Sequence, residues 1–163
     1  RGMSNRQLMA FIDAAFALHF DSKSHTGVLF VIGGVVIYVA SRKQKCMAKS
    51  PTEAELVGLT DNLGLVELFH EFLSFLFGTS IPIPIVYQDC TSVISLIVTR
   101  GGGITRIKHM HARVNLGKEC FDEKRAIVVY CNTSQMKADG ASKVLEGKGF
   151  EQFANFVQGI RTP

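Results

Sequence analysis

The stretch S-P-T-E-A-E-L at Ser50–Leu56 is the strongest local signal in the chain. It predicts the start of a long helix, because Ser50 is a favoured N-cap, Pro51 suits the first helical position and Glu53 completes a capping box with the N–H of Ser50. Apolar residues then recur at the three- and four-residue spacing of a buried helix face, at Leu56, Leu59, Leu63, Val66, Phe69, Phe72 and Leu73. The pattern predicts a helix over Ser50–Gly78.

Glu55, unlike Glu53, has no local capping role. It stands one turn before Leu59 and therefore lies close to the apolar face of the helix. A carboxylate next to a core is costly unless a cation or hydrogen bonds compensate it. Glu55 is thus the first indication of a metal site, whose other carboxylates must come from elsewhere in the chain.

Composition favours one globular domain over residues 1–163. Hydrophobic residues make up 47% of the chain, enough for a sizeable core. The net charge of +4 is compatible with a nucleic-acid partner. Four widely spaced cysteines without a C-x-x-C pair argue against zinc and favour free thiols in an intracellular protein. Because the chain opens Arg1-Gly2-Met3, we expect a domain excised from a longer polypeptide.

No stretch of the sequence favours a membrane partner. The longest apolar run, Val28–Ala40, is shorter than the roughly 20 residues that a spanning helix needs, and Gly33-Gly34 interrupts it. The helix predicted over Ser50–Gly78 is long enough but carries several acidic residues.

The remaining patterns predict alternating strands and helices. We expect strands at Gln7–Asp13, Thr26–Ile32, Val35–Ser41, Ile83–Gln88 and Ala126–Cys131, helices at Thr91–Val98, Arg106–Glu123, Met136–Leu145 and Gly149–Gly159, and a flexible loop at Arg100–Thr105. The first three strands form an antiparallel meander. The long helix between the third and fourth strands predicts a crossover onto a mixed sheet, and therefore an α/β fold.

Four carboxylates stand at places where such elements open onto clefts. Asp13 and Asp89 end predicted strands, and Glu55 and Asp139 lie in the first turns of predicted helices. Taken singly, each could simply cap a turn or helix. Clustered carboxylates repel one another and stay ionised together only with cations between them. Oxygen ligands suit Mg²⁺ or Mn²⁺, and two such ions can promote phosphodiester hydrolysis.

Basic residues gather in two segments near these carboxylates. Arg42, Lys43 and Lys45 lie before the long helix, and Arg106 and Lys108 lie in the later helical stretch. They either form solvated surfaces or contact backbone phosphates. His109 and His111 are two residues apart and face different ways on a helix, which argues against a metal pair.

Several motifs resemble a known family. F-I-D-A at Phe11–Ala14, S-R-K-Q-K at Ser41–Lys45, S-P-T-E-A-E-L at Ser50–Leu56, V-Y-Q-D at Val86–Asp89, I-K-H at Ile107–His109 and K-A-D at Lys137–Asp139 resemble the ribonuclease H domain of copia-type LTR retrotransposon Pol polyproteins. The resemblance extends from about Leu8 to Leu145. T-E-A-E after a basic segment is its most specific part.

The resemblance implies a ribonuclease H-like fold, a five-stranded mixed sheet with helices on both faces. It implies an endoribonuclease that cleaves the RNA strand of RNA–DNA hybrids with Mg²⁺ or Mn²⁺ held by Asp13, Glu55, Asp89 and Asp139. It also implies a neighbouring reverse transcriptase region in the same polyprotein and a cytoplasmic, virus-like-particle location. The family's motif selects Glu55 over Glu53, as the capping argument does.

Short polar groups beside the expected site would contact the hybrid. Gln88 and Ser92 are placed to read 2′-hydroxyls, unless they merely cap the following helix, and His109 belongs to the I-K-H motif. Two positions depart from the family pattern: Ala15-Phe16 replaces an Asp and a Trp, and Met110-His111 replaces I-D. The alternatives are a catalytically weak domain that binds nucleic acid or protein, and a DNA nuclease of the same fold.

Overall fold

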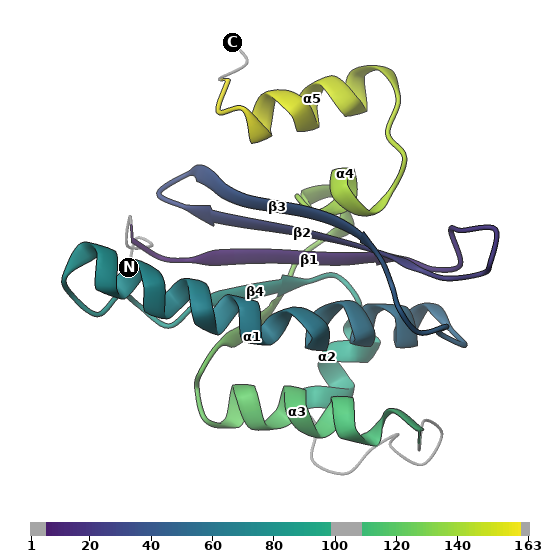
Figure 1. The fold of residues 1–163 in the computed structure, drawn as a ribbon, viewed down its shortest axis with the longest axis horizontal. Helices are drawn as coiled ribbons and strands as arrows, with labels where there is room; N and C mark the ends of the chain where they lie inside the picture. Colours follow the sequence, from purple (N-terminus) through teal and green to yellow (C-terminus); the bar gives the residue numbers. More distant parts are fainter. Residues whose placement is uncertain (1–5, 99–108, 161–163) are drawn as a thin grey trace.

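A five-stranded sheet forms the centre of the protein (Figure 1). The computed structural model describes residues 6–98 and 109–160. The strands are β1 (Met9–Ala15), β2 (His25–Ile32), β3 (Val35–Lys43), β4 (Ile85–Gln88) and β5 (Ile127–Tyr130). Their order is β3-β2-β1-β4-β5, antiparallel from β3 to β1 and parallel from β1 through β4 to β5. The predicted mixed sheet and meander are confirmed.

Helices cover both faces of this sheet, as Figure 1 shows. The helices are α1 (Pro51–Phe77), α2 (Thr91–Val98), α3 (His111–Asp122), α4 (Asp139–Ser142) and α5 (Gly147–Val157), with a 3₁₀ turn at Thr133–Gln135. Apolar side chains of α1, α2 and α3 pack with Ile12, Phe30 and Val86 on one face. On the other face, Phe153 and Phe156 of α5 pack beside Phe11 and Leu29. The strands β1, β2 and β4 therefore alternate their side chains between two cores.

Helix α1 begins and ends as its sequence signals predict. Ser50 Oγ accepts a hydrogen bond from the Glu53 N–H at 3.2 Å, and Gly78 closes the helix in the left-handed conformation at φ +62°. Burial along its apolar stripe is confirmed except at Phe69, which is half-buried, and at Phe72, which is 55% exposed while Leu73 next to it is buried. The last two turns of α1 thus present apolar side chains to solvent.

Most element boundaries are shifted by one or two residues from the sequence prediction, including β1, which continues two residues past Asp13, and three other elements also differ. The long helix expected over Met136–Leu145 is only the four-residue α4, because the backbone is extended at Lys143. Arg42 and Lys43 belong to β3, which is longer than expected. The described part of the expected Arg106–Glu123 helix begins at His111. The expected loop at Arg100–Thr105, with Arg106 and Lys108, lies outside the described residues.

None of the described helices combines enough length with enough apolar character to cross a bilayer.

Candidate metal centre

Three of the expected carboxylates meet at one edge of the sheet. Asp13, Glu55 and Asp89 each offer a carboxylate oxygen, and these three atoms lie within 4.8 Å of one another. The parallel pairing of β1 with β4 explains two of them, because Phe11 lies opposite Tyr87 and each Asp follows two residues later. Glu55 arrives from the first turn of α1, and so the capping box of that helix also positions the site.

Asp13 is almost completely enclosed, with 1% of its surface exposed. Burial raises the pKa of its carboxyl, and the nearby Asp139 and Asp89 raise it further, while the Ser142 hydroxyl and Lys143 oppose the shift. The Ser142 hydroxyl donates a short hydrogen bond to Asp13 Oδ2.

Glu55 is held by groups from β1 and β4. The Ala14 N–H donates to Glu55 Oε1 at 3.1 Å, and the Gln88 amide donates to Oε2 at 3.4 Å. Burial and the neighbouring Asp13 raise the pKa of Glu55 to about 8. In the absence of a cation, Glu55 therefore carries a proton at neutral pH.

Gln88 does not lie on the surface, where a residue that contacts the 2′-hydroxyls of the hybrid was expected. Its side chain is completely buried. Its amide oxygen accepts from the N–H groups of Asp89 and Cys90, at 2.9 and 3.3 Å, while its amide nitrogen faces Glu55. Gln88 thus ties the end of β4 to Glu55, and the surface that could touch nucleic acid is left to the exposed Ser92.

Asp139 lies outside the group of three carboxylates. Its Oδ1 atom is 2.6 Å from Lys143 Nζ, in an ion pair across one helical turn. It is nevertheless close enough to Asp13 to influence the pKa of that carboxyl. Asp89, by comparison, remains partly exposed and accepts a hydrogen bond from the Thr133 hydroxyl at 2.9 Å.

Glu53 caps the N-terminus of α1 and also contacts a histidine side chain. Its Oε2 atom accepts from the Lys49 N–H at 2.8 Å, one residue earlier than the predicted Ser50 N–H. Its Oε1 atom lies 3.2 Å from His109 Nε2. Both carboxylate oxygens are therefore engaged, and Glu53 is absent from the group of three.

A basic hollow of about 380 Å³ is lined by residues of β2, β3, α1 and α3 and of the segment after β3. The cationic side chains that line it are Arg42, Lys43, Lys45 and Arg113. Lys43 also pairs with Asp21 at 2.7 Å, and Arg113 with Asp61. Arg42 pairs across the sheet with Thr26, and Thr26 pairs with Ala14, one residue after Asp13. The first basic segment thus lies two strands away from the strand that carries Asp13.

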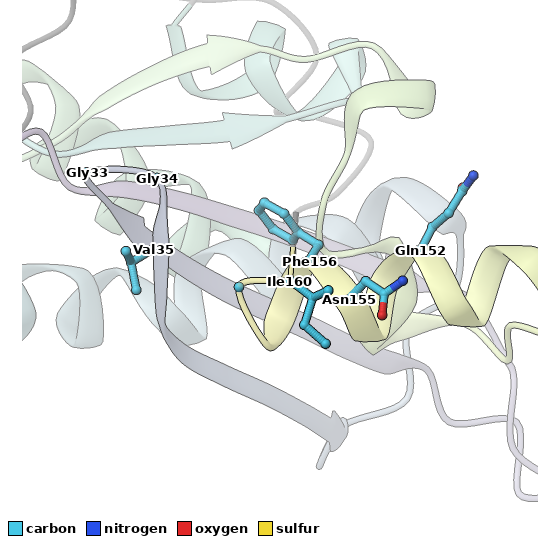
Figure 2. Close-up of a pocket in the computed structure, with 8 residues that line it drawn as sticks. Gly33, Gly34, Val35, Gln152, Asn155, Phe156 and Ile160 are labelled. Carbon is cyan, nitrogen blue, oxygen red and sulfur yellow. The ribbon is translucent and has the colours of Figure 1, made fainter. Parts of the chain in front are cut away.

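Another hollow, of about 560 Å³, lies at the far end of the sheet (Figure 2). It is bounded by the Gly33-Gly34 turn and by Gln152, Asn155 and Phe156 of α5. Its lining residues carry no titratable side chain. The turn joins the strand ends opposite those that carry Asp13, so this hollow is separate from the carboxylate cluster.

Sequence reasoning missed Ser142, Lys143 and the supporting role of Gln88. The four-residue spacing of Asp139 and Lys143 was an available signal, since side chains four apart meet on a helix. A second signal was Gly27, since a glycine inside a strand marks the close approach of another backbone. A Cβ atom at Gly27 would lie 2.5 Å from the Ser142 nitrogen and 2.6 Å from the Ala138 oxygen.

The donor set fits a hard divalent cation. Three carboxylate oxygens from three elements converge, and two of the side chains are buried beyond the reach of bulk solvent. Such ligands favour Mg²⁺ or Mn²⁺ over softer metals. Burial first, and the neighbouring carboxylates second, raise the pKa values of Asp13 and Glu55, and a cation bound among them would favour their ionised forms.

Comparison with solved structures identifies the fold. The chain superposes on LC11-RNase H1 in complex with RNA/DNA hybrid with a TM-score of 0.58 and 14% identity, covering 83% of this chain and 93% of that one. It also matches the prototype foamy virus protease-reverse transcriptase, with a TM-score of 0.51 and 12% identity, over 98% of this chain and 21% of that one. The chain therefore has the ribonuclease H-like fold.

Comparison of sequences gives a more specific relationship. Over 151 residues the chain is 33% identical to the retrovirus-related Pol polyprotein from transposon TNT 1-94 of Nicotiana tabacum, covering 92% of this chain and 11% of that polyprotein. No family model matches the sequence. The chain is thus a ribonuclease H-like relative of a retrotransposon Pol polyprotein, and it corresponds to about a tenth of that polyprotein's length. The expected resemblance to retrotransposon polyproteins is confirmed.

Proposed function

We propose that the chain is a metal-dependent endoribonuclease that cleaves the RNA strand of RNA–DNA hybrids. The observation that carries the proposal is the convergence of Asp13, Glu55 and Asp89 within 4.8 Å on a ribonuclease H-like fold. The relationship to a retrotransposon polyprotein supports a role in reverse transcription. A copia-type parent element, a neighbouring reverse transcriptase region and a cytoplasmic particle belong to the same proposal.

Asp13, Glu55 and Asp89 would hold the first ion, and Asp139 would complete a second position with Asp13. Bound Mg²⁺ or Mn²⁺ would supply an activated water and stabilise the leaving 3′-oxygen. Gln88 and the Ala14 N–H keep Glu55 directed at the site. The side chains of Asp13 and Glu55 are buried, which keeps bulk water away from them and so strengthens electrostatic interactions there.

The basic hollow would contact the phosphate backbone. Arg42, Lys43 and Lys45 line it, and Arg106, Lys108 and His109 are proposed to contact further phosphates of the hybrid. Ser92, exposed at the start of α2, is the proposed reader of 2′-hydroxyls, which distinguish RNA from DNA. Each phosphate contact that is removed should lower the slope of log affinity against log salt by roughly 0.7–0.9, and an unchanged slope would leave these residues as a solvated surface.

A cleavage assay tests the proposal directly. The domain is incubated with end-labelled RNA–DNA hybrid, RNA duplex and DNA duplex, in Mg²⁺, in Mn²⁺ and in EDTA. We expect cleavage of the hybrid alone, with 5′-phosphate and 3′-hydroxyl products and no cleavage in EDTA. Glu71→Gln, which neutralises an exposed carboxylate of α1, is the matched control for Glu55→Gln on the same helix and should cleave as the unchanged domain does.

Two other outcomes would overturn the proposal in different directions. Equal cleavage of duplex DNA would identify a DNA nuclease of the same fold. Binding of hybrid without cleavage in either metal would identify a catalytically weak binding domain.

A further inference from the structure

Lys143 follows helix α4, and its side chain turns back into the carboxylate cluster. Its ammonium nitrogen lies 2.6 Å from Asp139 Oδ1 and 3.5 Å from Asp13 Oδ2. The Asp13 side chain is 2% exposed, whereas that of Lys143 is 41% exposed. The ammonium group therefore stands at the mouth of the site, between carboxylates that come from opposite ends of the chain.

The position of Lys143 is fixed by the residues that precede it. Ser142 is completely buried and donates a hydrogen bond to Asp13, and the Lys143 N–H donates to the Asp139 carbonyl oxygen at 2.9 Å. The backbone of this segment lies directly against Gly27 of β2, with no room for a side chain between them. The backbone of Lys143 is thus anchored at the rim of the site, while its side chain is partly exposed to solvent.

Charge at the site is unbalanced without this lysine. Four acidic side chains lie at or beside the cluster, on Asp13, Glu55, Asp89 and Asp139, and only Glu55 among them is expected to be neutral at pH 7 in the metal-free domain. Within residues 6–98 and 109–160, Lys143 is the basic side chain that forms ion pairs with them. Ion pairing that bridges two acids in a largely buried site is less screened than on an open surface.

We propose that Lys143 is the resident cation of the site, occupying the space between Asp13 and Asp139 in the metal-free domain and giving way when a divalent ion binds there. The inference rests on the proposed function in so far as it takes the carboxylates to be metal ligands. Lys143 then has two opposed effects: it stabilises the metal-free fold by balancing the carboxylates, and it weakens metal binding by competing for the same oxygens.

Lys143→Met separates these two effects, because it keeps the apolar stem and removes the charge. In EDTA, the variant should melt about 2–4 °C below the unchanged domain, the shift expected from losing one modest interaction in a domain of this size. In calorimetric titration with Mn²⁺ alone, it should bind about five-fold more tightly or better, the lower end of usual coupling between competing ligands. Lys148→Met, at an exposed lysine of α5, is the control and should change neither quantity.

A double-mutant cycle distinguishes a counter-ion from a residue that merely packs. In an Asp13→Asn background, Lys143→Met should lower the melting temperature by less than it does in the unchanged domain, because one of its two partners is already neutral. Equal effects in both backgrounds, an unchanged melting temperature in EDTA, or unchanged or weaker Mn²⁺ binding would each overturn the inference. A wild-type domain that neither binds Mn²⁺ nor cuts hybrid would overturn the proposed function instead, and the EDTA comparison would still decide whether Lys143 is the counter-ion.

Discussion

The carboxylates of this site come from two regions that are built differently. Asp13, Glu55 and Asp89 sit at the ends of β1 and β4 and at the start of the 27-residue α1, and these elements form the main core. Asp139 sits on the four-residue α4, which is held in place by a hydrogen bond to Asp13 across 129 residues of sequence and by a close approach to Gly27. The first, which we call the core region, is packed into the main core, and the second depends on a few contacts at its edge.

The largest expected effect separates the two regions by activity. Asp89→Asn, Asp13→Asn or Glu55→Gln should each lower the rate of hybrid cleavage by about 10³-fold or more, since each removes a ligand worth several kcal/mol. Asp139→Asn should cost less, about ten-fold, because its carboxylate is outside the group of three. Single-turnover cleavage measures the rate of each variant, and full activity in Asp89→Asn would refute the assignment of the core region as the metal-binding site.

The next largest effect is expected in the pH dependence of the stability of the metal-free domain. The pKa of Glu55 is about 8 in the folded domain, above its ordinary 4.5, so the folded state holds a proton that the unfolded state releases. Stability of the metal-free domain should therefore fall as pH rises from about 4.5 towards 8, at up to roughly 1.4 kcal/mol per pH unit. Urea unfolding in EDTA measures this slope.

Glu55→Gln supplies the control for that slope. The variant has no titrating group at the position, and so it should lose most of the pH dependence and be the more stable protein at pH 8. Saturating Mg²⁺ should likewise flatten the slope in the unchanged domain. Identical pH profiles for the two proteins would show that ionisation of the buried Glu55 does not limit stability.

Gly27→Ala tests the contact that holds the second region. The new Cβ would lie within 2.8 Å of backbone atoms of Ala138, Ala141 and Ser142, in α4 and its N-cap, so we expect a loss of about 1–3 kcal/mol in the free energy of unfolding. Gly64→Ala is the matched control, because no heavy atom lies within 4 Å of its added Cβ and alanine is the better helix former by about 1 kcal/mol. A Gly27→Ala protein as stable as the unchanged domain would show that α4 yields easily.

The smallest expected effect is at Glu53. Glu53→Gln keeps an oxygen that can accept from the Lys49 N–H, since Gln also completes a capping box. Cleavage should stay within a few-fold of the unchanged domain, with a modest loss from weaker pairing to His109. If Glu53→Gln lost as much activity as Glu55→Gln in the same assay, the choice between the two glutamates would be wrong.

The core region could be predicted from the sequence because the patterns that specify its strands and helix are local. Apolar runs ending in Asp13 and Asp89, and the capping box before Glu55, each specify an element and the end of it that carries the acid. The mixed sheet and the helices on both faces followed from the order of such elements together with the resemblance.

The second region could not be predicted in the same way, because its structure depends on distant contacts. The apolar spacing after Met136 is compatible with a helix, yet Val144 is 78% exposed and a longer helix would bury little there. The place of Lys143 depends on Asp13, which is 130 residues earlier (143 − 13). The burial of Gln88 depends on Glu55 reaching it from another element.

The close approach of the backbone to Gly27 predicts how this position would behave in a mutational screen. Gly27 carries no functional group, yet any side chain at this strand position meets the backbone that presents Asp139 and Lys143. In a library of single substitutions screened only for retrotransposition or cleavage, Gly27 should therefore appear among the intolerant positions together with the carboxylates. Such a screen would separate it from them only when protein abundance is scored beside activity.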